Sequence, residues 1–196
     1  ASLSTFPSVK PGWVTLVVAT GLHEPPDKTE VIKLVDGDRL PEGVNLVGHD
    51  AVNSRFETVG TVSQGYEVEI NSLVAEADLT ISTGFIEPHF FAGFSGGRKS
   101  LLPGVASKAT ILSNHSFENV GDDNAGAGIL SGNPVHEGAS EAAELAGLDF
   151  SLNVVLNKDQ EIVGVCAGDF REVLTAGVTR ALEVCKVELD RYYDVV

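Results

Sequence analysis

The chain has 196 residues, of which 43% are hydrophobic, so it is long and apolar enough to bury the core of one globular domain. Its 28 acidic residues outnumber its 13 basic ones, and the net charge at pH 7 is −15. Such a charge repels the phosphates of nucleic acids and of anionic membranes, which excludes both as expected partners.

Short β-branched segments alternate with helical patterns along the chain, which is typical of an α/β fold. Residues 13–19 (WVTLVVA) predict a buried strand, and residues 20–23 follow its carboxyl end, where open α/β sheets bind ligands. Asp27 and Glu30 form a capping box that predicts a helix as far as residue 35. Further strands are expected over residues 44–47, 67–70 and 78–82, and a short helix over residues 71–77.

The second half of the chain begins with a helix whose two ends are marked. Asn133 provides an N-cap, Pro134 suits the first helical position, and Gly147 suits the end. Residues 150–156 and 161–165 then predict two strands paired across a turn.

The clearest helix pattern follows Asp169, whose side chain is expected to cap it. Apolar residues recur at i, i+3 and i+4 over residues 170–185, so Cys185 is expected on a buried stripe. Residues 193–196 suggest the start of another strand. Together these patterns predict a single α/β domain with a mostly parallel, Rossmann-like or mixed sheet flanked by helices.

The cellular compartment is expected to be the cytoplasm. The first residues show no basic-then-apolar leader pattern, and no apolar run approaches the ~18 residues of a membrane span. Cys166 and Cys185 are therefore expected to be reduced thiols and not a disulfide.

Residues 84–116 concentrate the side chains that are best suited to chemistry. His89, Lys99 and His115 lie around the glycine-rich turn of residues 93–97. Imidazole carries protons or binds a transition metal, and an amine can bond covalently to a cofactor. Taken singly, each of these residues is more often structural. Their proximity in the sequence makes a functional site the better interpretation.

The run Gly96-Gly97-Arg98-Lys99-Ser100 invites comparison with a nucleotide-binding P-loop. A P-loop has Gly directly before its Lys-Ser pair, whereas Arg98 occupies that position here. A true P-loop is therefore disfavoured. A single phosphate could still be bound by backbone amides and a guanidinium, which makes candidate cofactor-binding residues of Ser95, Gly96, Gly97 and Arg98.

Two further histidines are interpreted as structural. His49 precedes Asp50, a pairing that could ligate a metal, but a surface loop residue is the preferred reading. His136 lies in the first turn of a predicted helix, where a positive charge opposes the helix dipole. We expect His136 to be neutral, as scaffolding or as part of a site wall.

Five segments of the chain resemble the lactate racemase (LarA) family, and they are distributed along nearly its whole length. They are ATGLHEPP (19–26), NSLVAEADL (71–79), IEPHFFAGFSGGRKSLLPG (86–104), SNHS (113–116) and GNPVHEGASEAAELAG (132–147). The PHxxAGxSGGRK core within the third segment is highly specific.

The resemblance implies a nickel pincer cofactor made from nicotinic acid mononucleotide. By residue-to-residue match, Lys99 would hold this cofactor as a thioamide and His115 would be the protein ligand of nickel. His23 and His89 match the two histidines that act as acid/base catalysts in the family. The expected partners are a small 2-hydroxy acid substrate, the cofactor-synthesis proteins and the second domain of the parent protein.

The implied reaction is racemisation or epimerisation of a 2-hydroxy acid by hydride transfer to the pyridinium ring of the cofactor. The resemblance begins part-way into the family's sequence and ends where a second domain is expected. Residues 1–196 are therefore expected to form a partial cofactor-binding catalytic domain that is inactive by itself. Two alternatives remain open: a transferase domain that binds a nucleotide phosphate, and a non-catalytic cofactor-binding homologue.

Overall fold

The computed structural model describes residues 10–26, 29, 31 and 42–188. The strands are β1 (Thr15–Val18), β2 (Asn45–Gly48), β3 (Phe56–Thr61), β4 (Glu67–Asn71), β5 (Ile81–Phe85), β6 (Pro88–His89), β7 (Gly93–Phe94), β8 (Phe150–Leu156) and β9 (Ile162–Gly168). The helices are η2 (Pro11–Trp13), α2 (Ser72–Ala75), η3 (Gly97–Ser100), α3 (Lys108–Asn114), α4 (Phe117–Val120), α5 (Pro134–Leu145) and α6 (Phe170–Cys185).

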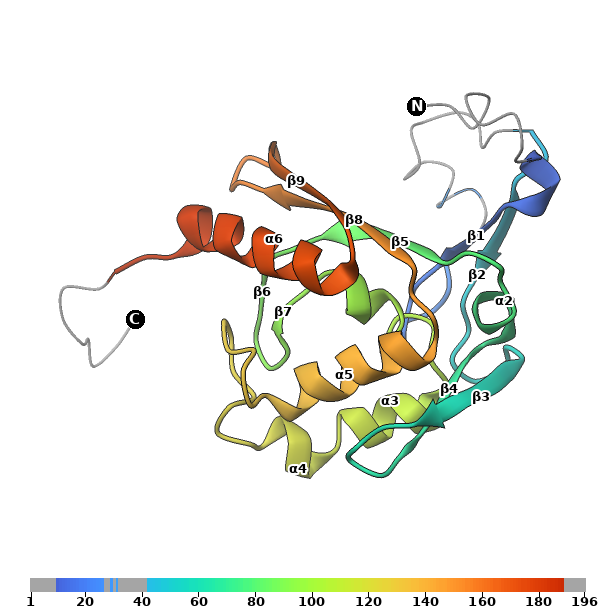
Figure 1. Ribbon diagram of the computed structural model, residues 1–196, viewed down its shortest axis with the longest axis horizontal. Helices are drawn as coiled ribbons and strands as arrows, with labels where there is room; N and C mark the ends of the chain where they lie inside the picture. The colour runs from blue at the N-terminus through green and yellow to red at the C-terminus, as the bar shows by residue number, and fades with distance from the viewer. Residues whose placement is uncertain (1–9, 27–28, 30, 32–41, 189–196) are drawn as a thin grey trace.

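The sheets are mixed, which confirms the α/β class and the mixed form of the expected sheet. The largest sheet has the strand order β5-β8-β9, with β5 parallel and β9 antiparallel to β8. β1 and β2 pair in parallel, whereas β3 with β4 and β6 with β7 form antiparallel pairs. In Figure 1, α6 lies along the β5-β8-β9 sheet, and α3 and α5 lie beside each other farther from it.

Both long helices begin where the sequence predicts. The Asn133 side chain accepts hydrogen bonds from the backbone of Val135 and His136, and Pro134 occupies the first helical turn of α5. The Asp169 side chain caps α6 in the same way. Gly147, after the end of α5, adopts a φ of 69°, a left-handed conformation that favours glycine.

Two hydrophobic clusters surround the segment from Ile86 to Leu102. Ile86 and Phe94 are buried in the cluster between β8 and α6. Leu101 and Leu102 are buried in the cluster formed with β4 and α5. Full burial of a side chain of this size stabilises the fold by roughly 1.5–3 kcal/mol. The segment that contains His89 and Lys99 is therefore anchored at several points.

Some predicted boundaries are wrong. The strand expected at residues 78–82 begins later, as β5, because its partner β8 starts only at Phe150, which pairs with Ile81. The N–H of Thr80 instead donates to a carboxylate oxygen of Asp149 at 2.8 Å. Asn71, placed inside the predicted short helix, is the N-cap of α2.

The two cysteines are free thiols, as expected. Cys185 is exposed, however, which corrects its assignment to a buried stripe. The buried residues of α6 end at Ala181, one turn earlier. The predicted helix of residues 27–35 and the predicted strand of residues 193–196 lie outside the described residues.

Candidate active site

Lys99 lies in η3, directly after a turn that only glycine fits. Gly96 has a φ of 99°, and a Cβ there would lie 2.6 Å from Cγ1 of Ile86 and 2.8 Å from Oδ1 of Asn153. The N–H of Gly97 donates to the same Asn153 oxygen at 2.8 Å. Strand β8 therefore positions η3 through the buried Asn153 side chain.

The guanidinium of Arg98 is turned inward, and the residue is 1% exposed. Its Nη2 donates to the carbonyl oxygens of Ala92 at 3.1 Å and Phe94 at 2.9 Å. Its Nη1 donates to the carbonyl oxygens of Ser95 at 3.3 Å and Gly96 at 3.4 Å. The buried Arg98 side chain therefore holds together the backbone of residues 92–96, which includes β7.

The groups expected to cradle a phosphate are used inside the loop. Besides the Arg98 guanidinium and the Gly97 N–H, the Ser95 hydroxyl donates to the carbonyl of Phe85 at 2.9 Å and accepts the N–H of Glu87 at 2.9 Å. This geometry favours a loop-holding role for these groups over direct contact with a phosphate.

His89 lies at the start of the turn that connects β6 and β7. Its Nδ1 accepts the backbone N–H groups of Phe91 at 3.4 Å and Ala92 at 3.2 Å. The ring of Phe90 stacks on the imidazole, with centroids 4.6 Å apart and an interplanar angle of 13°. These contacts define both the position and the tilt of the imidazole.

Three of the predicted residues converge on the ring of Phe91. The centroid of the His89 ring lies 4.7 Å from the Phe91 centroid, and that of His115 lies 5.0 Å from it. The Nζ of Lys99 lies 5.8 Å from the same centroid. The structure therefore brings together His89, Lys99 and His115, which the sequence separates.

The environment of the cluster favours the uncharged forms of Lys99 and His89. Burial, followed by the neighbouring charge of Arg98, lowers the pKa of Lys99 to about 8. Burial also lowers the pKa of His89 to about 4, with smaller contributions from the charges of Lys99, His115 and Arg98. At neutral pH His89 is uncharged, and a fraction of the Lys99 side chains is present as the neutral amine.

His115 caps the carboxyl end of α3, and its two ring nitrogens have different roles. Its Nδ1 lies 3.1 Å from the carbonyl oxygen of Ile111, which can only accept a hydrogen bond. Nδ1 therefore carries the proton of the neutral ring, and Nε2 keeps a lone pair. Burial lowers the pKa of His115; the hydrogen bond to the Ile111 carbonyl opposes this in part, and the charge of Lys99 adds a smaller lowering. A neutral imidazole with a free Nε2 is a good transition-metal ligand.

His23 lies on an exposed turn after β1. Its backbone N–H donates to the carbonyl of Thr20 at 3.1 Å, and the N–H of Gly21 donates to the carbonyl of Gly104 at 2.9 Å. The turn is thus attached to the chain shortly after Lys99. Within the described residues, the His23 ring makes no hydrogen bond or ring contact with the cluster around Phe91.

His49 is a buried residue, which corrects its assignment to a surface loop. Its Nε2 lies 3.0 Å from the carbonyl oxygen of Ala106, and its Nδ1 lies 3.2 Å from Nδ2 of Asn71. The ring of Phe56 meets it edge to face. His49 connects β2 to β4 and to the chain after η3, a tertiary contact that the local sequence does not reveal.

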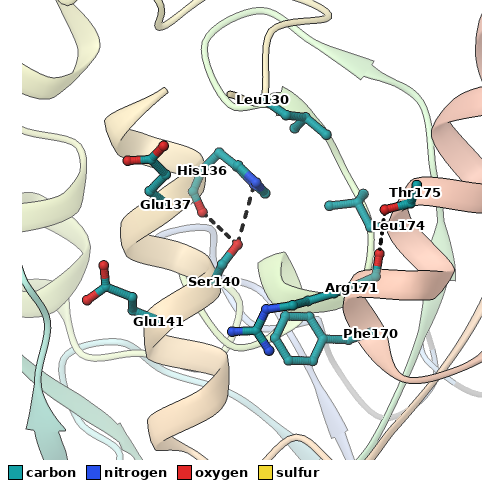
Figure 2. A pocket seen from close by; sticks show the side chains of 9 residues that line it. All are labelled: Leu130, His136, Glu137, Ser140, Glu141, Phe170, Arg171, Leu174 and Thr175. Carbon is teal, nitrogen blue, oxygen red and sulfur yellow. Dashed lines mark hydrogen bonds between the residues drawn. The ribbon is translucent and has the colours of Figure 1, made fainter. Parts of the chain in front are cut away.

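His136 lines an open cavity of about 350 Å³ between α5 and α6 (Figure 2). Figure 2 shows the imidazole pointing from α5 towards Leu130 and Leu174, with Arg171 and Phe170 at another side of the cavity. Burial, then the charges of Arg98 and Arg171, lowers the pKa of His136 to about 4. His136 is therefore neutral, as predicted. None of the residues expected to be catalytic lines this cavity.

Sequence reasoning missed two residues that shape the site. Phe91 belongs to the recognised EPHFFAG run, but nothing in the local pattern shows that three candidate site residues meet on its ring. Asn133 was predicted only as a helix cap; its Nδ2 also donates to the carbonyl of Phe91 at 2.9 Å. Both roles depend on contacts between distant segments.

Two features are absent from the described residues: a membrane-spanning helix and a cluster of metal-binding side chains. No helix in this part of the chain combines the length and the hydropathy that a membrane span requires. Nor do three or more His, Cys, Asp or Glu side chains gather there as a group able to hold a metal ion.

The family is settled by comparison with known proteins. Residues 6–128 match the model of the lactate racemase N-terminal domain. This chain belongs to the lactate racemase family. The matched residues include the turn with His23 and the whole cluster of His89, Lys99 and His115.

Two lactate racemases are similar to the chain over most of its length. The protein from Thermoanaerobacterium thermosaccharolyticum is 43% identical over 175 residues, and the one from Lactiplantibacillus plantarum is 41% identical over 175 residues. Each alignment covers 89% of this chain and 41% of the relative. The chain thus spans about two fifths of the length of these curated relatives.

Solved structures support the fold. The lactate racemase apoprotein from Thermoanaerobacterium thermosaccharolyticum matches with a TM-score of 0.83 at 43% identity, over 87% of this chain and 41% of that one. A protein from Thermotoga maritima matches with a TM-score of 0.75 at 21% identity, over 90% of this chain and 48% of that one. The second likeness shows a shared fold.

Proposed function

We propose that the chain is the cofactor-binding catalytic part of a racemase or epimerase that acts on a 2-hydroxy acid. The observation that carries the proposal is the convergence of His89, Lys99 and His115 on the ring of Phe91. The cluster supplies an acid/base group, an amine nucleophile and a metal ligand in one place. The names of the curated relatives support lactate, or a similar acid, as the substrate.

The side chains present fit a nickel pincer cofactor derived from nicotinic acid mononucleotide. Lys99, with its pKa of about 8, would hold the group covalently, because the neutral amine that attacks is accessible near physiological pH. His115 would ligate nickel through Nε2, because its Nδ1 proton faces the Ile111 carbonyl. When bound, the cofactor would supply the acceptor for the hydride of the substrate.

His89 and His23 are proposed to move the hydroxyl proton of the substrate. Racemisation must be served from both faces of the carbon, so one imidazole takes the proton of one enantiomer and the other returns a proton on the opposite face. Each such group contributes roughly 10²–10⁴-fold to the rate. His89 enters this reaction uncharged because its pKa is about 4.

The test begins with the chain co-expressed with the enzymes that make the cofactor. Intact-protein mass spectrometry is expected to show one covalent adduct on Lys99, and metal analysis to show stoichiometric nickel. In the His115→Ala variant the adduct should remain while nickel retention falls, because the covalent attachment survives the loss of the ligand. Nucleotide binding without nickel would favour a transferase instead. Neither adduct nor nucleotide would favour a non-catalytic homologue.

Turnover is then measured on the loaded sample by chiral chromatography, from each lactate enantiomer, beside the loaded relative from Thermoanaerobacterium thermosaccharolyticum. We expect the chain to be slower by at least about 10²-fold, because reacting groups that are not held in a closed, water-poor site are misplaced. Phe90 and His23 are exposed to solvent here. A rate equal to that of the relative would show that these residues hold the entire active site.

A further inference from the structure

The backbone of the turn of residues 90–92 contacts one ring nitrogen of His89. The N–H groups of Phe91 and Ala92 both point at Nδ1 of the imidazole. A backbone N–H is a donor only, so Nδ1 must accept and cannot carry a proton in this arrangement. The proton of the neutral ring is therefore on Nε2.

Two buried side chains hold the carbonyl groups of the same turn. Nδ2 of Asn133 donates to the carbonyl of Phe91 at 2.9 Å, and Nη2 of Arg98 donates to the carbonyl of Ala92 at 3.1 Å. Asn133 is 0% exposed and Arg98 is 1% exposed. The peptide group between Phe91 and Ala92, whose N–H points at His89, is thus fixed at its oxygen by Asn133. Arg98 fixes the oxygen of the next peptide group, between Ala92 and Gly93.

The close of the turn leaves little freedom to rearrange. Gly93 has a φ of 75°, and a Cβ at this position would lie 2.3 Å from the carbonyl oxygen of Ile129. Nδ2 of Asn133 donates to that same Ile129 oxygen at 2.9 Å. Asn133 therefore hydrogen-bonds to both segments that approach each other here, through the carbonyl oxygens of Phe91 and Ile129.

His115 shows what the opposite arrangement looks like. Its Nδ1 faces a carbonyl oxygen and not an N–H, so its Nε2 has the lone pair. The neutral rings of His89 and His115 thus present opposite atoms, an N–H and a lone pair, from one cluster. The backbone partner of Nδ1 determines the difference in each case.

We propose that Arg98 and Asn133 are positioning residues that act through the turn to hold neutral His89 as its Nε2–H tautomer. His89 then meets its substrate as a hydrogen-bond donor to an oxygen atom. The identity of that oxygen, the hydroxyl or keto oxygen of a 2-hydroxy acid, rests on the proposed function. A proton on Nδ1 would point at the N–H groups of Phe91 and Ala92, so three hydrogen-bond donors would face one another. Nε2 can accept a proton only if the proton of the neutral ring is on Nδ1 instead. His89 can therefore accept a proton at Nε2 only when the turn releases Nδ1.

Nuclear magnetic resonance of the chain labelled with ¹⁵N in histidine tests the inference directly. Long-range ¹H–¹⁵N correlations distinguish a protonated ring nitrogen from an unprotonated one, and the His89→Gln spectrum identifies the His89 signals. At neutral pH we expect a protonated Nε2 and an unprotonated Nδ1 for His89. The measurement needs neither cofactor nor turnover, so it can fail or succeed independently of the proposed function.

Asn133→Ser is the informative variant. Serine keeps an oxygen that caps α5, but its side chain is too short to donate to the Phe91 carbonyl. We expect the ratio of the Nε2–H to the Nδ1–H tautomer of His89 to fall on the order of tenfold, the effect of losing one ordinary hydrogen bond. Asn157→Ser is the matched control, because Asn157 also accepts backbone N–H groups but lies in the β8–β9 turn.

The outcomes separate cleanly. A protonated Nδ1 on His89 in the parent chain would overturn the inference at once, whether or not any variant folds. An unchanged tautomer ratio in both Asn133→Ser and Arg98→Lys, with backbone spectra that show the native fold, would remove the two residues from the positioning role. A shift in Asn133→Ser with none in Asn157→Ser supports it.

Discussion

The ring of Phe91 meets the ring of His115 edge to face, with centroids 5.0 Å apart and planes at 90°. This contact joins the β6–β7 turn to the end of α3. Because His89 and Lys99 contact the same ring, the geometry of the whole cluster depends on a side chain with no chemistry of its own. Phe91 is consequently a sensitive place to perturb the site.

Replacing Phe91 with Leu should weaken the cluster more than the fold. The variant loses four contacts of the Phe91 ring, with His89, Phe90, His115 and the amine of Lys99. We expect the free energy of unfolding to fall by about 1–2 kcal/mol, as for a partly buried large-to-small change. Nickel retained per loaded chain should fall further than this. Phe90→Leu is the control, since Phe90 is 76% exposed and its ring contacts His89 and Phe91 but neither Lys99 nor His115. Equal nickel content in the two variants would contradict the central role of Phe91.

Lys99→Arg should abolish covalent attachment of the cofactor while leaving the fold intact. A guanidinium keeps the charge but is not a nucleophile at neutral pH. Intact-protein mass spectrometry after co-expression with the cofactor-making enzymes measures the adduct. Lys108→Arg, at an exposed position of α3, should retain the full adduct. An undiminished adduct in the Lys99→Arg protein would assign the attachment to another residue.

The lowered pKa of Lys99 predicts how stability depends on pH. The folded state releases this proton near pH 8 and the unfolded state near pH 10.5, so between these values the unfolded chain binds more protons and stability rises with pH. Below pH 8 the cost of burying the cation is fully present. Lys99→Met should therefore be more stable than the parent at pH 7, and the difference should narrow from pH 8 to pH 10.5.

Urea unfolding of both proteins across this range measures that difference, in which titrations common to the two cancel. Lys108→Met serves as the exposed control and should show no such narrowing. A constant difference between Lys99→Met and the parent would mean that the folded protein does not lower the pKa of Lys99.

His23→Ala should expose the division of labour between the two proposed acid/base groups. In loaded protein, net interconversion should fall roughly 10²–10⁴-fold in both directions. Formation of the keto acid from one enantiomer should persist, because His89 can still take the hydroxyl proton on its own face once the turn of residues 90–92 releases Nδ1. Chiral chromatography measures the interconversion, and keto-acid detection measures the half-reaction. Glu24→Ala, at the exposed neighbouring position, is the control. Racemisation at the parental rate would make His23 a structural residue.

Local patterns predicted much of the fold because caps and periodicity act over a few residues. Asn133 and Asp169 cap their helices as predicted, and the strands of residues 150–156 and 161–165 pair across the expected turn. The predicted start of β5 was wrong because the extent of a strand depends on its partner. Ile81 pairs with the first residue of β8. Burial of His49 was missed for the same kind of reason.

The sequence by itself determined the family of the chain and which side chains are the candidates for its chemistry, since residue types and short spacings are properties of the chain alone. Tertiary structure decided how those residues meet. Phe91 brings three of them together, and Arg98 turns inward to hold the loop. Such contacts join segments that lie far apart in sequence, and the protonated nitrogen of each histidine depends on which backbone group faces its Nδ1, so no local pattern could specify them.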